Sequence, residues 1–165
     1  MAELQLHVDA GQAQSELDAI LARLQRTRPL MAGIAAELLS ETEAQFGAQG
    51  NPKWKALAAA TISARSKADT WPGMVLQVST AGLAASVRTE HSDSTATIGA
   101  GAGKSAAYAA IQQFGGQAGR GKKVTIPARP YLPLVDGVGG VQLLPKTEKA
   151  ITAMALQFVE NGRAK

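Results

Sequence analysis

The stretch Thr95–Phe114, TATIGAGAGKSAAYAAIQQF, decides between two folds. A β-prone run, a glycine-rich turn ending in Lys104 and Ser105, and a helix-prone run follow one another, which is the context of a phosphate-binding loop. That motif also requires a glycine five positions before Gly103, where this sequence has Ile98. Because the loop is one residue short, its N–H groups would not converge on one phosphate. The sequence favours a glycine turn leading into a helix over a nucleotide-binding fold.

The sequence before this stretch predicts one strand and two helices. Glu3–Asp9 alternates polar and apolar residues, the period-2 pattern of a half-buried strand. Gln14–Gln25 places leucines and an isoleucine at helical spacing. Pro29 suits the first position of a second, long helix, which continues through Phe46 until Gly47 stops it.

The middle of the chain predicts short elements separated by turns. Ala56–Lys67 has the composition of a short helix, Val75–Val78 that of a strand, and Gly82–Ser86 that of a helical turn. Val87–Glu90 and Ala96–Ile98 flank a polar turn and predict a β-hairpin.

The C-terminal part predicts a helix over Ser105–Phe114, then a flexible basic loop at about 117–126, and an amphipathic helix over Thr147–Glu160. Between the last two, Pro127–Pro133 has too many prolines for regular structure, and Pro133 disfavours a central strand in Tyr131–Asp136. The whole pattern predicts an α+β fold in one domain, residues 1–165. A small antiparallel sheet would pack with a long N-terminal helix region and a C-terminal helix.

Composition excludes several chemistries. The 165 residues include no cysteine, which rules out disulfides, thiolate catalysis and cysteine-bound zinc. No signal peptide or membrane-spanning run is predicted. His7 and His91 are far apart and lack acidic partners at metal-ligand spacing, and Glu37 with Glu41 is more typical of a solvated helix face than of a metal site. We therefore expect no enzyme activity, no metal and no cofactor.

Charge is unevenly placed although the net charge is only +4. Residues 1–47 carry seven acidic and three basic residues, whereas two later clusters are basic: Lys53, Lys55, Arg65 and Lys67, then Arg120, Lys122, Lys123 and Arg129. Such asymmetry indicates an acidic partner surface or a nucleic acid. A sequence-independent DNA-binding module is therefore one hypothesis for the function.

Four motifs in a fixed order suggest a second hypothesis. After Phe46-Gly47 comes the first, Gly50-x-Pro52-x-Trp54-x-x-Leu57 with Thr61; the others are Thr80-Ala-Gly82-Leu83-x-x-Ser86, Tyr108-Ala-x-Ile-Gln-Gln-Phe114-Gly115-Gly116 and Pro127-Ala-Arg129-Pro130-Tyr131-Leu132. Together they resemble the signature of the phage virion morphogenesis family, the tail-completion proteins of Mu-like phages. Gln112 stands where the family usually has histidine, and Ala81 where it has glycine. The resemblance covers about residues 30 to 160.

The resemblance implies a structural protein of the phage neck or tail, found in the host cytoplasm during assembly. Its subunits would form a sixfold ring that completes the tail tube and joins it to the head. The implied partners are further copies of the chain, the tail tube protein and head–tail connector or adaptor proteins, with non-specific contact to packaged DNA as a further option and no membrane.

A ring repeats one pair of surfaces around its axis, so turns of fixed shape make useful docking edges. The predicted interface residues are Phe114, Gly115, Gly116, Arg120, Lys122, Lys123, Arg129 and Tyr131. For Arg129, held between two prolines, we expect a carboxylate partner in this chain or a neighbouring subunit. The basic loop would order against a neighbouring ring or face DNA. Trp54, Leu57, Tyr108 and Phe114 are more typical of core residues than of an interface.

Overall fold

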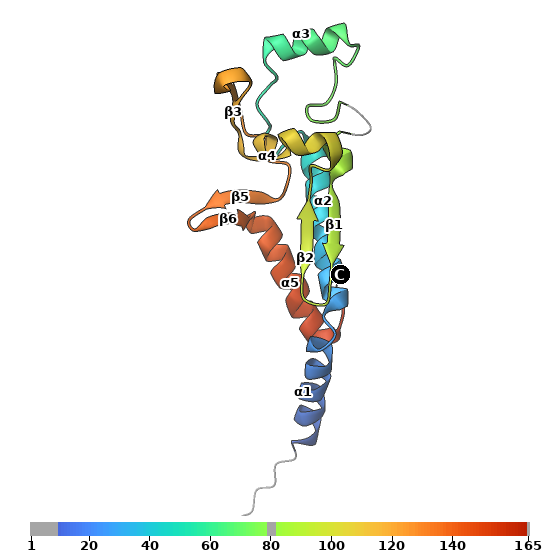
Figure 1. Cartoon of the computed structure of the whole chain (residues 1–165). Helices are drawn as coiled ribbons and strands as arrows, with labels where there is room; N and C mark the ends of the chain where they lie inside the picture. The colour runs from blue at the N-terminus through green and yellow to red at the C-terminus, as the bar shows by residue number, and fades with distance from the viewer. Residues whose placement is uncertain (1–9, 79–81, 165) are drawn as a thin grey trace, which may run out of the picture.

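The computed structural model describes residues 10–78 and 82–164 and shows an α+β fold (Figure 1). Within these residues lie five helices: α1 (Gly11–Leu24), α2 (Arg28–Ala48), α3 (Ala59–Lys67), α4 (Ala106–Phe114) and α5 (Pro145–Asn161). The strands form three separate antiparallel hairpins: β1 (Arg88–His91) with β2 (Ala96–Gly99), β3 (Gly116–Ala118) with β4 (Val124–Ile126), and β5 (Leu134–Gly137) with β6 (Gly140–Leu143). The predicted strand Glu3–Asp9 lies outside the described residues.

Helix α2 is the axis of the molecule. It contacts α5 and the β1–β2 hairpin, and both lie along it in Figure 1. Leu30, Leu38 and Phe46 on α2 are buried, as the helical spacing predicts. Gly33 allows a close approach, because a Cβ there would lie 2.8 Å from the carbonyl oxygen of Ala164. The C-terminal segment therefore packs directly against the α2 backbone.

Helix α1 continues the axis beyond the body of the molecule as a stalk (Figure 1). None of its residues is buried. Its main tether is Arg23, whose Nη1 donates to the carbonyl oxygens of Val159 at 2.6 Å and Glu160 at 2.8 Å. A cation at this place complements the unpaired carbonyls and the negative dipole end of α5.

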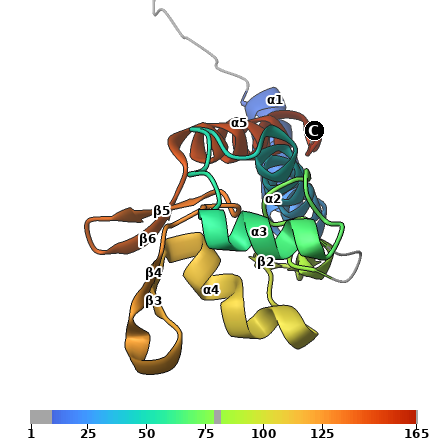
Figure 2. The same ribbon diagram turned by 90° about the horizontal axis from the view of Figure 1, so that it is seen from above.

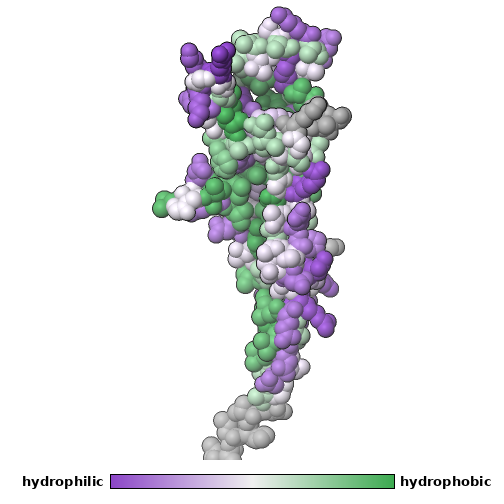
Figure 3. All heavy atoms as spheres, in the orientation of Figure 1, coloured by the Kyte–Doolittle hydropathy of each residue, from purple (hydrophilic) through white to green (hydrophobic). Residues whose placement is uncertain are grey.

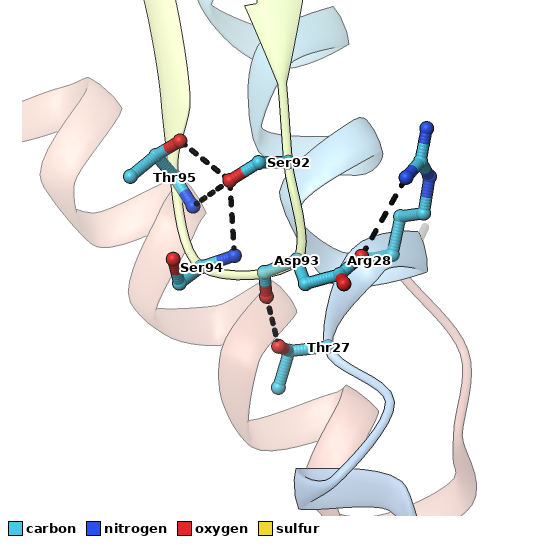
Figure 4. A network of polar contacts seen from close by, with 6 residues as sticks. All are labelled: Thr27, Arg28, Ser92, Asp93, Ser94 and Thr95. Carbon is cyan, nitrogen blue, oxygen red and sulfur yellow. Dashed lines mark hydrogen bonds and ion pairs between the residues drawn. The ribbon is translucent and has the colours of Figure 1, made fainter.

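The turn of the β1–β2 hairpin docks at the junction of α1 and α2 (Figure 4). The Thr27 hydroxyl donates to the Asp93 carbonyl, and the Arg28 guanidinium lies 3.6 Å from the Asp93 carboxylate. Inside the turn, the hydroxyls of Ser92 and Thr95 lie 2.7 Å apart in a hydrogen bond. The predicted hairpin is confirmed, and these contacts fix its turn against the helices.

One predicted strand is wrong. Val75–Val78 forms turns, because Leu76 has a left-handed φ of 37° and the Val75 N–H donates to the Gln49 side-chain oxygen at 2.5 Å instead of to a partner strand. The short helix predicted from Ala56 begins at Ala59, and α2 continues one residue past Gly47.

Two hairpins were not predicted. The segment expected to be a flexible basic loop contains β3 and β4, joined by a kinked turn at Arg120–Lys122 in which Gly121 has a φ of 72°. The other hairpin, β5–β6, begins directly after Pro133, which lies outside the strand and accepts a hydrogen bond from the Leu144 N–H at 2.9 Å. The proline thus marks the start of a strand. Seen from above, both hairpins project from the same side of the body (Figure 2).

Candidate functional site

The family-like motifs converge on one aromatic cluster. The Phe46 ring meets Trp54 edge-on with centroids 5.9 Å apart and lies 5.4 Å from the ring of Tyr131. Trp54 Nε1 donates to the Pro130 carbonyl at 2.9 Å, which joins the first motif to the last. Gly50 has a φ of 90°, and a Cβ there would lie 2.4 Å from Trp54 Cδ1. Glycine is therefore required for the indole to pack.

Gln113 joins the third motif to the fourth. Its side chain is 2% exposed, and its Oε1 accepts hydrogen bonds from the N–H groups of Tyr131 and Leu132, each at 2.9 Å. The Tyr131 hydroxyl donates to the Ala109 carbonyl at 3.1 Å. Burial raises the pKa of Tyr131 to about 12. The proline-rich segment lacks regular structure but is held by side chains of α4.

Arg129 is also interior, with 5% of its surface exposed. Its Nε and Nη2 donate to the carbonyls of Lys55 at 3.1 Å and Ala56 at 3.2 Å, and its Nη1 lies 3.4 Å from Gln112 Oε1. Burial lowers the pKa of Arg129. Among the described residues, Arg129 has no carboxylate partner of the kind that we expected within the chain or in a neighbouring subunit. Its guanidinium N–H groups instead donate to the two backbone carbonyls and to the Gln112 side-chain oxygen.

A cleft of about 220 Å³ lies between α3 and α4, and we call it the Arg65–Arg129 cleft. Arg65 is 9% exposed; its Nη2 donates to the Met74 carbonyl at 3.0 Å, and its guanidinium lies 5.4 Å from the Trp71 ring centroid. Arg65 Nε is buried and has no hydrogen-bond acceptor among the described residues. No carboxylate of the part of the chain that the structure describes lines the cleft. Its wall is mostly apolar: Leu57, Val75, Leu76, Val78, Leu83 and Tyr108, with Thr61, Gly82 and Gln112.

The predicted interface residues fall into two groups. Phe114, Gly116, Arg120, Lys122 and Lys123 are exposed, at the end of α4 and on the β3–β4 hairpin. Arg129 and Tyr131 are buried, and a Cβ on the half-buried Gly115 would lie 2.8 Å from the Ala128 nitrogen. The interface role of these residues stays a prediction.

The predicted motif residues also differ in burial. Leu83 and Gly82 are buried, whereas Trp54, Leu57 and Pro127 are half-buried. Tyr108, Thr61 and Pro130 are exposed; Tyr108 is 37% exposed and Phe114 46%, so these two aromatics are not core residues.

Two exposed apolar surfaces were missed by sequence reasoning (Figure 3). Leu17, Leu21 and Leu24 on the α1 stalk are each at least half exposed, and Val138 at the tip of β5–β6 is 99% exposed. Figure 3 shows hydrophobic atoms along one side of the stalk and at the end of this hairpin. The leucine spacing gave a signal for the first surface, but it predicts equally well a helix buried against the core.

The glycine turn Gly99–Ser105 does connect a strand to a helix, since β2 ends at Gly99 and α4 begins at Ala106. The Ser105 hydroxyl, however, is buried and donates to the Ala102 carbonyl at 2.8 Å, so it does not face a ligand. Among the described residues there is no cluster of three or more potential metal ligands. In the same ranges, no helix combines the length and hydropathy needed to cross a membrane. Glu41, considered above for a metal, pairs with Lys146 at 2.7 Å.

The motif residues of this chain therefore join its own turns, while apolar and basic side chains project from the body. Such an arrangement suits a structural or assembly protein. Comparison with known proteins agrees, because the model of the phage virion morphogenesis family matches residues 8–157. The chain belongs to this family, whose members are typically non-enzymatic structural or assembly proteins.

Two relatives cover most of the chain. "Mu-like prophage FluMu G protein 2" of Haemophilus influenzae is 36% identical over 134 residues, which are 81% of this chain and 85% of the relative. "Putative capsid assembly protein G" of Escherichia phage Mu is 31% identical over 160 residues, 94% and 98% of the two chains. No solved structure matches the chain significantly. The chain is thus a Mu G-like virion morphogenesis protein.

Proposed function

We propose that the chain is a subunit of a ring, with six copies, at the head-proximal end of the phage tail. The ring completes the tail tube and joins it to the head, and its partners are the tail tube protein and the head–tail connector or adaptor proteins. In this proposal the protein resides in the neck of the virion after assembly in the host cytoplasm. Its family membership over residues 8–157 supports a role in virion assembly.

The observation that carries the proposal is the distribution of exposed apolar surface. A ring needs two different, complementary surfaces on each subunit, because the contact between neighbours is head-to-tail. The β5–β6 hairpin projects sideways from the body and has the fully exposed Val138 at its turn. The α1 stalk extends from one end of the molecule with its leucine stripe uncovered (Figures 1 and 3). An elongated subunit of this form can contact its ring neighbours and a further layer of the neck.

Light scattering tests this proposal, with the purified chain alone and mixed with tail tubes. We expect either the mass of about six subunits or a monomer that becomes a ring only on tube ends. A chain that stays monomeric and does not bind tubes would contradict the proposal.

The basic β3–β4 hairpin favours a second candidate, a sequence-independent DNA-binding module. Arg120, Lys122 and Lys123 are exposed at its turn and form no ion pair among the described residues. If they neutralise phosphates, the affinity for duplex DNA falls with salt by about 0.9 log units per log unit of salt for each contact.

Replacing all three residues by alanine should then reduce the salt slope by roughly 2.7, whereas Lys149→Ala on α5 should leave it unchanged. Salt-sensitive DNA binding by a monomer that ignores tail tubes would favour this candidate over the ring.

A further inference from the structure

We propose that the β5–β6 hairpin of one copy docks in the Arg65–Arg129 cleft of a second copy, and that this contact links neighbours around the ring. The inference rests on the proposed ring function and names the two surfaces that would meet. Asp136 on the hairpin supplies the carboxylate, and Arg65 and Arg129 supply the cations.

The hairpin combines an apolar tip with a single acidic residue. Val138 is 99% exposed and Val141 is 53% exposed. Asp136 pairs directly with Val141 across the two strands, so both side chains lie on the same face of the hairpin. Asp136 is exposed and forms no ion pair among the described residues. One face therefore offers a carboxylate beside the exposed Val141, and the fully exposed Val138 lies at the turn next to it.

The tip is held in a fixed shape before it meets a partner. Gln142 Nε2 donates to the Val138 carbonyl at 3.1 Å, across the turn. The Gln142 side chain crosses so closely that a Cβ on Gly137 would lie 2.4 Å from its Cδ. Because the turn is already ordered, docking would cost little conformational entropy.

The Arg65–Arg129 cleft carries positive charge, opposite to the negative charge of Asp136 on the hairpin. Arg65 and Arg129 are at least nine-tenths buried, and every hydrogen-bond acceptor that they contact is a neutral oxygen. Within residues 10–78 and 82–164, Arg65 Nε has no hydrogen-bond acceptor. Buried cations without an anion are unfavourable, so the positive charges of both guanidinium groups would attract a carboxylate that enters the cleft.

The size and the apolar wall of the Arg65–Arg129 cleft also match the tip of the β5–β6 hairpin. The volume of about 220 Å³ is many times the roughly 10–15 Å³ that a cavity needs to hold one water molecule. It suits a valine side chain with a carboxylate beside it, and Leu57, Leu76 and Leu83 provide an apolar wall. The hairpin and the cleft are different surfaces of one chain, as a head-to-tail contact requires.

Cysteine trapping tests the contact, and the chain contains no cysteine of its own. Thr61 lines the cleft and is exposed, so Thr61→Cys marks the cleft and Val138→Cys marks the tip. Mixing the two single variants under oxidising conditions should give a covalent dimer. Ser63→Cys is the matched control, since Ser63 lies on α3 and is exposed but does not line the cleft. No more dimer with Thr61→Cys than with Ser63→Cys would overturn the inference.

A charge reversal gives a second measurement. Asp136→Lys should weaken self-association at least ~10-fold at low salt, because it places a cation against two arginines. Glu160→Lys makes the same charge change at another exposed position and should alter self-association less than twofold. Equal effects of the two variants would contradict the docking.

The outcomes separate this inference from the proposed function. Wild-type rings without specific trapping would overturn the docking and leave the ring function standing. Specific trapping in a chain that forms no ring and binds no tubes would support the contact and contradict the function.

Discussion

Gln113→Ala tests whether the contacts between the third and fourth motifs stabilise the fold. The Gln113 side chain is buried, and its Oε1 is the acceptor for the N–H groups of both Tyr131 and Leu132 at 2.9 Å. Alanine removes this acceptor and leaves two N–H groups without a partner. Tyr131 is buried and Leu132 is partly buried, so water can compensate for at most one of the two losses.

The expected loss follows from these contacts. An unsatisfied buried N–H costs about 1 to 3 kcal/mol, so the two together reduce the free energy of unfolding by about 2 to 4 kcal/mol when one is partly hydrated. For a chain of this length, each kcal/mol lowers Tm by roughly 2 to 4 °C, which gives a decrease of roughly 5 to 15 °C.

Urea and thermal unfolding, followed by circular dichroism, measure this loss. The neighbouring Gln112→Ala is the matched control, because Gln112 Oε1 accepts only one long hydrogen bond, from Arg129 at 3.4 Å. We expect the control to lose less than about 1 kcal/mol. If Gln113→Ala were no less stable than Gln112→Ala, the reasoning about the cluster would be refuted.

Three further predictions concern stability. Gly50→Ala should destabilise by about 1 to 3 kcal/mol in urea unfolding, because its Cβ would collide with Trp54 at a φ of 90°, whereas Gly47→Ala, in a helix with open space around it, should stabilise by up to about 1 kcal/mol. Tyr131 has a pKa raised to about 12 from 10.0, so its neutral form is favoured in the folded state; this stabilisation is complete below pH 10 and is lost as pH rises to about 12. Tyr131→Phe should therefore show a shallower loss of stability over that pH range than the wild type, and an equal slope would contradict the assignment. Arg23→Ala should speed hydrogen exchange in α1 with little effect on α2, and unchanged exchange in α1 would show that other contacts tether the stalk.

The sequence correctly predicted the helices and strands that depend only on the residues of their own segment. The helical spacing of Leu30, Leu38 and Phe46 predicted α2, and the polar turn around Asp93 predicted the β1–β2 hairpin. The strand predicted at Val75–Val78 was wrong because the structure there depends on a residue distant in sequence. The Val75 N–H donates to Gln49, and no strand of the described residues pairs with this segment. β-propensity alone does not supply a partner strand.

The candidate site was only partly predictable for the same reason. The motifs identified the segments that meet, since Trp54 contacts Pro130 and Gln113 contacts Tyr131. They did not reveal which side chains face inward, and Arg129 is buried against carbonyls that no sequence pattern indicates. The exposed Val138 lies in a hairpin that was not predicted, because we expected Pro133 to disfavour a central strand in Tyr131–Asp136. The exposure of Val138 follows from the position of the hairpin in the fold and not from the local sequence.

The most direct test of the proposed role is negative-stain imaging of tail tubes of the encoding phage, incubated with the chain carrying a gold label at its C-terminus. The account predicts label at one end of each tube, in ring-shaped density, and tubes that become able to join heads. Label scattered along the tubes, or bound only to duplex DNA in the same mixture, would contradict the account.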